Sequence, residues 1–241
     1  MAWYKNWFDT EFYHLLYCHR DMSEAEGFIA LLKQTLQLPN GAKVLDVACG
    51  KGRHSITLNK LGLDVTGIDL SANSITEAKK WENETLHFAE WDMRQTFRKN
   101  DFDVVVNLFS SFGYFDDNTD DERAINAMSE SLKPGGILVL DYINTQFAVT
   151  QMKPREIINR NEIQFHIQKK VEAGFIKKKI EFIANGENLC YEEQLKVINK
   201  AAFEIMFMSN RLTIEHTYGD YALQPFNAAT SPRLILIGKK I

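Results

Sequence analysis

The residues best suited to chemistry form a glycine-containing turn at 48–52, between an apolar segment and a stretch that could begin a helix. Gly50 and Gly52 allow the backbone to approach a ligand closely, because glycine carries no Cβ atom. A helix that begins just beyond them presents unpaired amide donors and a partial positive charge. The turn is therefore suited to bind a carboxylate or a phosphate group.

Two acidic residues follow the next apolar segments. Asp69 comes after 64–68, about 20 residues beyond the turn, where a carboxylate of a nucleotide-binding sheet commonly accepts hydrogen bonds from ribose hydroxyls. Asp92 comes after 86–89 and precedes Met93. Because ligands of open α/β sheets bind beyond the carboxyl ends of the strands, we expect the turn and both carboxylates to converge on one ligand.

The elements that must position these residues are short, nearly continuous apolar segments that alternate with helix-like stretches. Such segments are typical of strands buried on both faces, and their alternation with helices predicts a parallel sheet wrapped by helices. A terminal antiparallel pair of strands is expected, with the last strand of the sheet reversed. The predicted strands are 44–48, 64–68, 86–89, 102–106, 137–140, 212–217 and 234–238, and the predicted helices include 75–81, 124–132 and 203–209.

Residues 150–198 have a different character, because apolar and polar residues alternate from Ile163 to Ile167. Asn185-Gly186 predicts a hairpin turn, and the lysine run 177–179 could not be buried on both faces of a sheet. We expect a small antiparallel β insertion here that caps the substrate site. Residues 1–149 and 199–241 would then form the ligand-binding domain, with an amphipathic, aromatic-rich helix over 4–16.

Taken in order, these motifs resemble those of class I S-adenosylmethionine-dependent methyltransferases, and more narrowly the small bacterial enzymes of the methyltransferase domain 25 kind. The resemblance covers most of the chain. Residues 46–52 are similar to the first motif of the family, Asp69 to its ribose-binding acid, Asp92 with Met93 to its adenine pair, and 133–136 to the turn before its fifth strand. Ala48 is a departure, since many members have glycine there.

The resemblance implies an α/β fold with a Rossmann-like seven-stranded sheet, helices on both faces and the small antiparallel insertion. It also implies S-adenosyl-L-methionine as cofactor and methyl transfer without a covalent intermediate. By position and charge, Arg20 could pair with the methionine carboxylate. The residues expected at the cofactor are Asp46, Ala48, Cys49, Gly50, Gly52, Asp69, Leu70, Asp92, Met93, Asn107, Leu108 and Arg20.

The acceptor is expected to be a small molecule. The stretch 107–114 differs from Asn-Pro-Pro-Tyr, the family variant that methylates exocyclic amines on nucleic acids and some proteins. Phe109 with its aromatic neighbours could shape an apolar pocket or pack under a loop, while His54 and Asp141 are further candidates with structural alternatives. No catalytic residue is assigned. The residues predicted to line the substrate site are Tyr13, Tyr17, Phe112, Tyr114, Tyr142 and Tyr218.

Composition narrows the possible partners. The net charge of -4, from 28 basic and 32 acidic residues, argues against a broad nucleic-acid footprint. The three cysteines form no CxxC pair and the six histidines no HxxxH pair, so we expect no metal and a reducing compartment. No apolar run approaches the roughly 20 residues that cross a bilayer. We therefore expect a cytoplasmic protein, monomeric or homodimeric, that acts on neither membranes nor nucleic acid.

Three alternatives stay open at this point. A nicotinamide-dinucleotide site would need a third glycine where Ser55 stands, so its fingerprint is incomplete. The protein could instead bind the cofactor without transferring a methyl group. It could also act on RNA through the lysine-rich insertion, which contains Lys169, Lys170 and 177–179.

Overall fold

A seven-stranded sheet forms the centre of the computed structural model, which describes residues 7–17 and 22–241. The strand order is β10-β11-β5-β4-β1-β2-β3. β1 to β5 are parallel, and β11 runs antiparallel to both of its neighbours. The predicted sheet with its reversed last strand is therefore confirmed. Its strands are β1 (Lys43–Val47), β2 (Asp64–Asp69), β3 (Leu86–Glu90), β4 (Phe102–Asn107), β5 (Leu132–Ile143), β10 (Leu212–Tyr218) and β11 (Arg233–Lys240).

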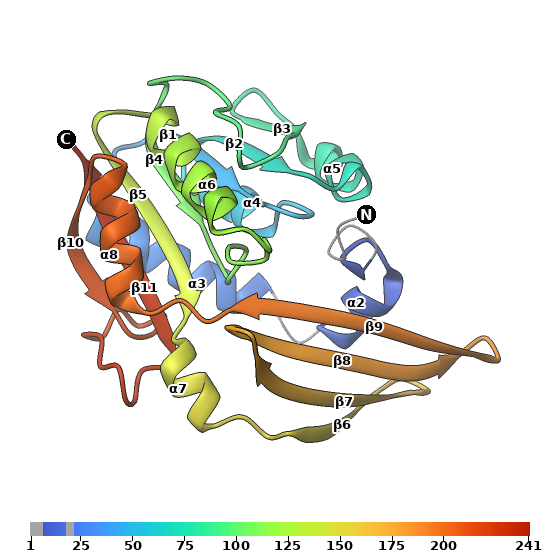
Figure 1. Ribbon diagram of the computed structural model, residues 1–241. Helices are drawn as coiled ribbons and strands as arrows, with labels where there is room; N and C mark the ends of the chain where they lie inside the picture. The colour runs from blue at the N-terminus through green and yellow to red at the C-terminus, as the bar shows by residue number, and fades with distance from the viewer. Residues whose placement is uncertain (1–6, 18–21) are drawn as a thin grey trace.

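Helices cover both faces of this sheet (Figure 1). One face packs against α3 (Met22–Thr35), α4 (Arg53–Lys60) and α5 (Ala72–Ala78), which continues into the 3-10 turn η1 (Lys79–Trp81). The other face packs against α6 (Asn118–Ser131) and α8 (Lys200–Ser209). Val44 and Val104 contribute to the first core, while Leu45 and Val105 contribute to the second. The nearly continuous apolar runs of these strands arise because both faces are buried.

Side chains fix where several helices begin. The hydroxyl of Ser71 accepts a hydrogen bond of 3.0 Å from the backbone N–H of Ser74 at the start of α5. At the start of α6 the carboxylate of Asp117 accepts one of 2.9 Å from the N–H of Thr119. Such N-caps satisfy amide donors that the helix itself leaves unpaired. They place the first turns of both helices at the edge of the sheet where the parallel strands end.

A second sheet extends from the first as a separate layer (Figure 1). It follows α7 (Thr145–Thr150), a helix that the sequence did not predict, and its four strands pair antiparallel in chain order. Asn185 and Gly186 both have positive φ angles, of 53° and 80°, as a two-residue hairpin turn requires. The antiparallel β insertion is confirmed. Its strands are β6 (Arg155–Arg160), β7 (Ile163–Glu172), β8 (Phe175–Ala184) and β9 (Glu187–Lys196).

Residues 7–17 pack against the apolar face of the second sheet. Trp7 and Leu16 are buried there against Phe165 and Phe182. The helix predicted over 4–16 is confirmed only in its later part, as α2 (Glu11–Leu16), and residues 1–6 lie outside the described residues. Thr10 is the N-cap of α2, since its hydroxyl accepts a 3.1 Å hydrogen bond from the N–H of Tyr13. Within the described ranges, every helix is too short or too polar to cross a membrane.

Candidate functional site

A cavity of about 440 Å³ lies beyond the carboxyl ends of β1 to β4. Its walls come from the segments that follow those four strands and from residues 8–17, which close the opposite side. Open α/β sheets bind their ligands at this edge. Within the described part of the chain, residues 150–198 contribute nothing to the lining, so the second sheet supports the cavity through residues 7–17.

In the turn after β1, three alternate residues have the left-handed backbone conformation. Ala48, Gly50 and Gly52 have φ angles of 60°, 56° and 82°. A Cβ atom built on Gly52 would lie 2.6 Å from the ring of Phe88 on β3, so only glycine fits between the turn and that strand. Gly52 is also the N-cap of α4 and lies outside the cavity lining.

Of these three residues only Ala48 is strained, because it alone has a Cβ atom, which lies too close to the following carbonyl oxygen in the left-handed conformation. Ala48→Gly is expected to raise the free energy of unfolding by about 0.5–1 kcal/mol, the relief of strain exceeding the added entropy of the unfolded chain. Urea unfolding measures this. As a matched control, Ala124→Gly in the interior of α6 should lower the free energy of unfolding by about 1 kcal/mol or more, and a loss at both positions would contradict the strain at Ala48.

Two carboxylates lie beside this turn, that of Asp69, which is half-buried, and that of Asp46, which is buried. Asp69 accepts hydrogen bonds of 2.8 Å from the backbone N–H of Gly50 and of Ser71, which ties the turn to the start of α5. Burial raises the pKa of Asp69 against the effect of these hydrogen bonds. Asp46 is 1% exposed and accepts a 2.6 Å hydrogen bond from the hydroxyl of Ser55. Burial raises the pKa of Asp46 to about 7, and the neighbouring charge of Asp69 acts in the same direction. Both carboxylates would be stabilised by a cation or by hydroxyl donors in the cavity.

The thiol of Cys49 and the imidazole of His54 also line the cavity, and both are uncharged at neutral pH. Burial raises the pKa of the Cys49 thiol well above its usual value. Burial, followed by the charge of Arg53, lowers the pKa of His54 to about 3. A thiol of this kind is a poor nucleophile. Neither residue therefore provides a charged group to the site.

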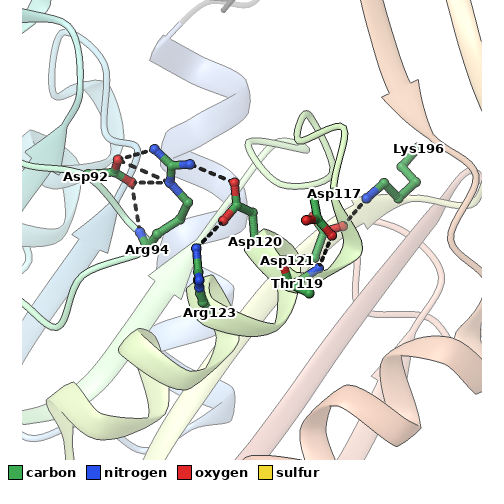
Figure 2. A network of polar contacts seen from close by, with 8 residues as sticks. All are labelled: Asp92, Arg94, Asp117, Thr119, Asp120, Asp121, Arg123 and Lys196. Carbon is green, nitrogen blue, oxygen red and sulfur yellow. Dashed lines mark hydrogen bonds and ion pairs between the residues drawn. The ribbon is translucent and has the colours of Figure 1, made fainter.

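The segment after β3 brings Asp92 into the cavity wall between Trp91 and Met93. Figure 2 shows that the carboxylate of Asp92 is paired with the guanidinium of Arg94, with distances of 3.0 Å from Nε to Oδ1 and 2.6 Å from Nη2 to Oδ2. The backbone N–H of Arg94 donates to the same Oδ1 at 3.0 Å. Contacts with the side chain and backbone of Arg94 thus fix the orientation of the Asp92 carboxylate.

The loop after β4 has two consecutive non-glycine residues with positive φ, Phe109 at 57° and Ser110 at 60°. The N–H of Phe109 donates to Oδ2 of Asp141 at 2.7 Å, and Nη2 of Arg233 donates to the hydroxyl of Ser110 at 3.0 Å. Asp141 and Arg233 form an ion pair of 2.7 Å beneath the loop. Asp141 is fully buried and does not line the cavity, so the hypothesis that it faces a substrate is wrong. It holds the loop instead.

The cavity brings together most of the residues predicted to contact a cofactor. Asn107 is an exception, because it is fully buried and its Nδ2 donates to the carbonyl of Val47 at 3.0 Å, which ties β4 to β1. Arg20 lies outside the described residues. The predicted cofactor residues in the lining are Asp46, Ala48, Cys49, Gly50, Asp69, Leu70, Asp92, Met93 and Leu108.

Only half of the predicted substrate-lining residues reach the cavity, namely Tyr13, Tyr17 and Tyr114. Phe112, Tyr142 and Tyr218 do not, and their assignments are corrected. Phe112 is fully buried against Phe203 of α8. The hydroxyl of Tyr142 donates to the carbonyl of Lys196 at 2.6 Å inside the same core. Tyr218 is partly buried and packs against the core on the other face of the sheet.

Several lining residues were missed, although most of them stand next to predicted ones in the sequence. Phe8 and His14 enter because residues 7–17 fold over the cavity, which no local pattern indicates. Ser71 and Ser74 could have been expected, since they form the helix start that follows Asp69. The missed residues are Phe8, His14, Lys51, Arg53, Ser71, Ser74, Trp91 and Phe115.

A charged group from the second sheet supports the tyrosine side of the cavity. The hydroxyl of Tyr17 donates to Glu193 on β9 at 2.8 Å, and the indole N–H of Trp7 donates to the same carboxylate at 2.6 Å. Lys178 on β8 contacts the hydroxyl of Tyr17 and forms an ion pair of 3.4 Å with Glu193. Residues 7–17 are thereby attached to the second sheet by polar contacts as well as by apolar packing.

Comparisons with known proteins agree with this geometry. Residues 44–136 match a family model described as a methyltransferase domain. The dTDP-3-amino-3,4,6-trideoxy-alpha-D-glucopyranose N,N-dimethyltransferase of Streptomyces venezuelae is 33% identical over 136 residues, which are 55% of this chain and 56% of that protein. The chain spans about half the length of the curated relatives it matches.

Solved structures match over nearly the whole chain. A S-adenosylmethionine-dependent methyltransferase from Clostridium acetobutylicum has a TM-score of 0.79 at 20% identity, over 94% of this chain and 95% of that one. An amino pentose methyltransferase from Micromonospora echinaspora, solved with S-adenosylmethionine bound, has a TM-score of 0.73 at 19% identity, over 96% and 98%. At such identities the likeness concerns the fold. Residues 44–136 are thus similar to a methyltransferase domain, and the chain has the fold of these S-adenosylmethionine-dependent methyltransferases of known structure.

Proposed function

We propose that this protein transfers a methyl group from S-adenosylmethionine to a small molecule, with the cofactor bound in the cavity at the ends of β1 to β4. One observation carries the proposal: the left-handed turn at Gly50 and the carboxylates of Asp69 and Asp92 line the same cavity. These groups come from three different strand ends, as the binding site of an α/β sheet requires.

The chemistry of the lining fits this cofactor. The carboxylates of buried Asp46 and half-buried Asp69 suit a cationic amino-acid group and ribose hydroxyls, because such partners would offset the desolvation of the charged carboxylates. Asp92 presents acceptor oxygens that suit an exocyclic amine. When bound, S-adenosylmethionine supplies an electrophilic methyl group on a sulfonium, so the chain need not supply a nucleophile. The proposed contacts are Asp46, Ala48, Cys49, Gly50, Asp69, Leu70, Asp92, Met93 and Leu108.

The acceptor is proposed to bind on the aromatic side of the cavity. Phe8 packs against Tyr13 and Tyr114, with ring centroids 4.9 and 5.3 Å apart. Such a wall excludes water and can orient a small acceptor so that its nucleophilic atom is aligned with the methyl group. The relative from Streptomyces venezuelae is named for methylation of an amino sugar, which makes small amines the first class to test. Residues 150–198 would serve as the cap that supports this wall, and 1–149 with 199–241 as the cofactor-binding domain.

The RNA-directed alternative is disfavoured by the charges of the insertion. Lys169 is paired with Glu156 at 2.6 Å, and Lys179 is paired with Glu181 at 2.8 Å. Lys170 and Lys177 share Glu172, at 2.8 Å each. Paired lysines of this kind lack the excess positive charge that binds a phosphate backbone. We infer a small-molecule enzyme; its cytoplasmic location and its monomeric or homodimeric state rest on the sequence.

Calorimetry with S-adenosylhomocysteine and S-adenosylmethionine tests the proposal. Asp69→Asn is expected to weaken binding about 10- to 100-fold, because one carboxylate oxygen that accepts hydrogen bonds becomes an amide donor. Asp64→Asn, at the other end of β2, is the matched control and should bind as the unaltered protein does. Absence of binding by the unaltered protein would contradict the proposal. Formation of S-adenosylhomocysteine with a panel of small amines then separates a methyltransferase from a protein that only binds the cofactor.

A further inference from the structure

Arg94 lies outside the cavity lining but contacts two residues that belong to it. Its guanidinium donates hydrogen bonds from Nε and Nη2 to the carboxylate of Asp92, at 3.0 and 2.6 Å. The centre of the same guanidinium lies 5.1 Å from the ring centroid of Phe115, which is 8% exposed. Arg94 thus supports one polar and one apolar part of the cavity wall at the same time.

The far side of the guanidinium is fixed to α6. Nη1 of Arg94 donates to Oδ2 of Asp120 at 2.7 Å, in the first turn of that helix (Figure 2). The side chains of Asp92 and Asp120 are each 19% exposed, and that of Arg94 is 32% exposed. Hydrogen bonding to Asp92 and Asp120 raises the pKa of Arg94 against the effect of burial. The guanidinium therefore stays charged between two carboxylates and cannot rotate without breaking contacts at both ends.

A carboxylate held in this way offers only acceptors to the cavity. An ionised carboxylate has no proton to donate, and the bidentate contact with Arg94 fixes the plane of Asp92. A 6-amino purine can donate a hydrogen bond to such a group, whereas a 6-oxo purine presents a carbonyl oxygen to it. Phe115 would meanwhile limit where a flat ring can lie, because the stacked guanidinium holds its ring in place.

We propose that Arg94 is the positioning residue for base recognition, which fixes Asp92 and Phe115 so that the site accepts an adenine ring and rejects a 6-oxo purine. The inference rests on the proposed function and assigns a role to a residue that does not touch the cofactor.

Arg123 provides a matched control. It pairs with the other oxygen of Asp120 at 3.1 Å, so it belongs to the same network (Figure 2). Its side chain is 68% exposed, however, and its ion pair is with Asp120 rather than with the cavity wall. A general loss of charge near α6 would affect both arginines, whereas the proposed role belongs to Arg94 alone. Arg94→Lys is a second informative change, since a lysine ammonium cannot make the planar bidentate contact.

The experiment compares the binding of S-adenosylhomocysteine and its 6-oxo analogue S-inosylhomocysteine by calorimetry. The unaltered protein should prefer the adenine ligand by at least about 100-fold, as a site with a buried polar partner does. For Arg94→Met we expect the Kd for the adenine ligand to rise about tenfold and the preference to fall below about tenfold, with Arg94→Lys closer to Met than to Arg. Arg123→Ala should leave both Kd values within about twofold, as expected for an exposed ion pair.

A folded Arg94→Met protein with an unchanged preference would overturn the inference. So would an unaltered protein that binds both ligands equally, and in that case the proposed function would stand. An unaltered protein that binds neither ligand would instead refute the proposed function. If Arg94→Met fails to fold, Asp120→Ala removes the far anchor and keeps the contact with Asp92; a preference unchanged there would likewise overturn the inference.

Discussion

Arg233→Met is expected to lower the free energy of unfolding by about 3–5 kcal/mol, the range for removing one partner of a buried ion pair. Asp141 is fully buried, and its Oδ1 accepts hydrogen bonds from Nε and Nη2 of Arg233 at 2.8 and 2.7 Å. Methionine fills a similar volume but provides no donor. The change therefore leaves a buried carboxylate without its counter-charge, which is costly in a low-dielectric interior.

Urea unfolding followed by circular dichroism measures this loss. Lys239→Met on the same strand is the control. The side chain of Lys239 is 51% exposed and its ammonium lies 4.0 Å from the carboxylate of Glu215. Loss of this exposed ion pair should lower the free energy of unfolding by at most about 0.5 kcal/mol. Adding Asp141→Asn to Arg233→Met should recover part of the loss, since the unpaired charge is then removed. Equal small losses for Arg233→Met and Lys239→Met would show that the ion pair does not stabilise the fold.

The same ion pair connects stability to the cavity. Phe109 and Ser110 keep their left-handed backbone because Asp141 accepts from the N–H of Phe109 and Arg233 donates to the hydroxyl of Ser110. Left-handed conformations of non-glycine residues persist where surrounding contacts enforce them. Phe109 in turn stacks between His54 and Tyr221, at centroid distances of 4.6 and 4.7 Å. Loss of Arg233 would therefore loosen the cavity wall as well as the core.

The second large effect concerns pH. The pKa of Asp46 is about 7 in the folded protein against 3.8 as its ordinary value. Between these values the folded state retains a proton that the unfolded state has released, so raising the pH favours unfolding. Asp46 should therefore contribute stability below about pH 4 that is lost as the pH rises through about 7, with a total of about 4 kcal/mol as an order of magnitude.

Asp46→Asn tests this linkage, because asparagine can still accept the hydrogen bond of Ser55 but does not ionise. The difference in unfolding free energy between the variant and the unaltered protein should grow in favour of the variant from about pH 4 to about pH 8. Comparing the two proteins at each pH cancels the contributions of the other titrating groups to the unfolding free energy. Among these groups, Asp69 and Asp121 have pKa values that are raised, as that of Asp46 is. Asp64→Asn should give a flat difference, and a flat difference for Asp46→Asn too would refute the raised pKa.

Much of the fold could be predicted because its signals are local. The apolar runs of β1 and β4 indicate strands buried on both faces, and Asn185-Gly186 predicts a hairpin through backbone conformation alone. The convergence of the glycine turn, Asp69 and Asp92 was predictable as well, since the ends of parallel strands share one edge.

What the sequence determined by itself was therefore the strands of the main sheet, the location of the site at the strand ends and the acidic residues that enter it. Only the tertiary structure decided which aromatic side chains face the cavity. An aromatic residue such as Tyr142 or Phe112 can line a pocket or pack in a core, and its type alone does not distinguish the two; both are buried in the core. It also decided the pairs Arg233 with Asp141 and Arg94 with Asp120, which are far apart in the chain. Local preference depends on near neighbours, whereas such contacts arise only when packing brings distant segments together.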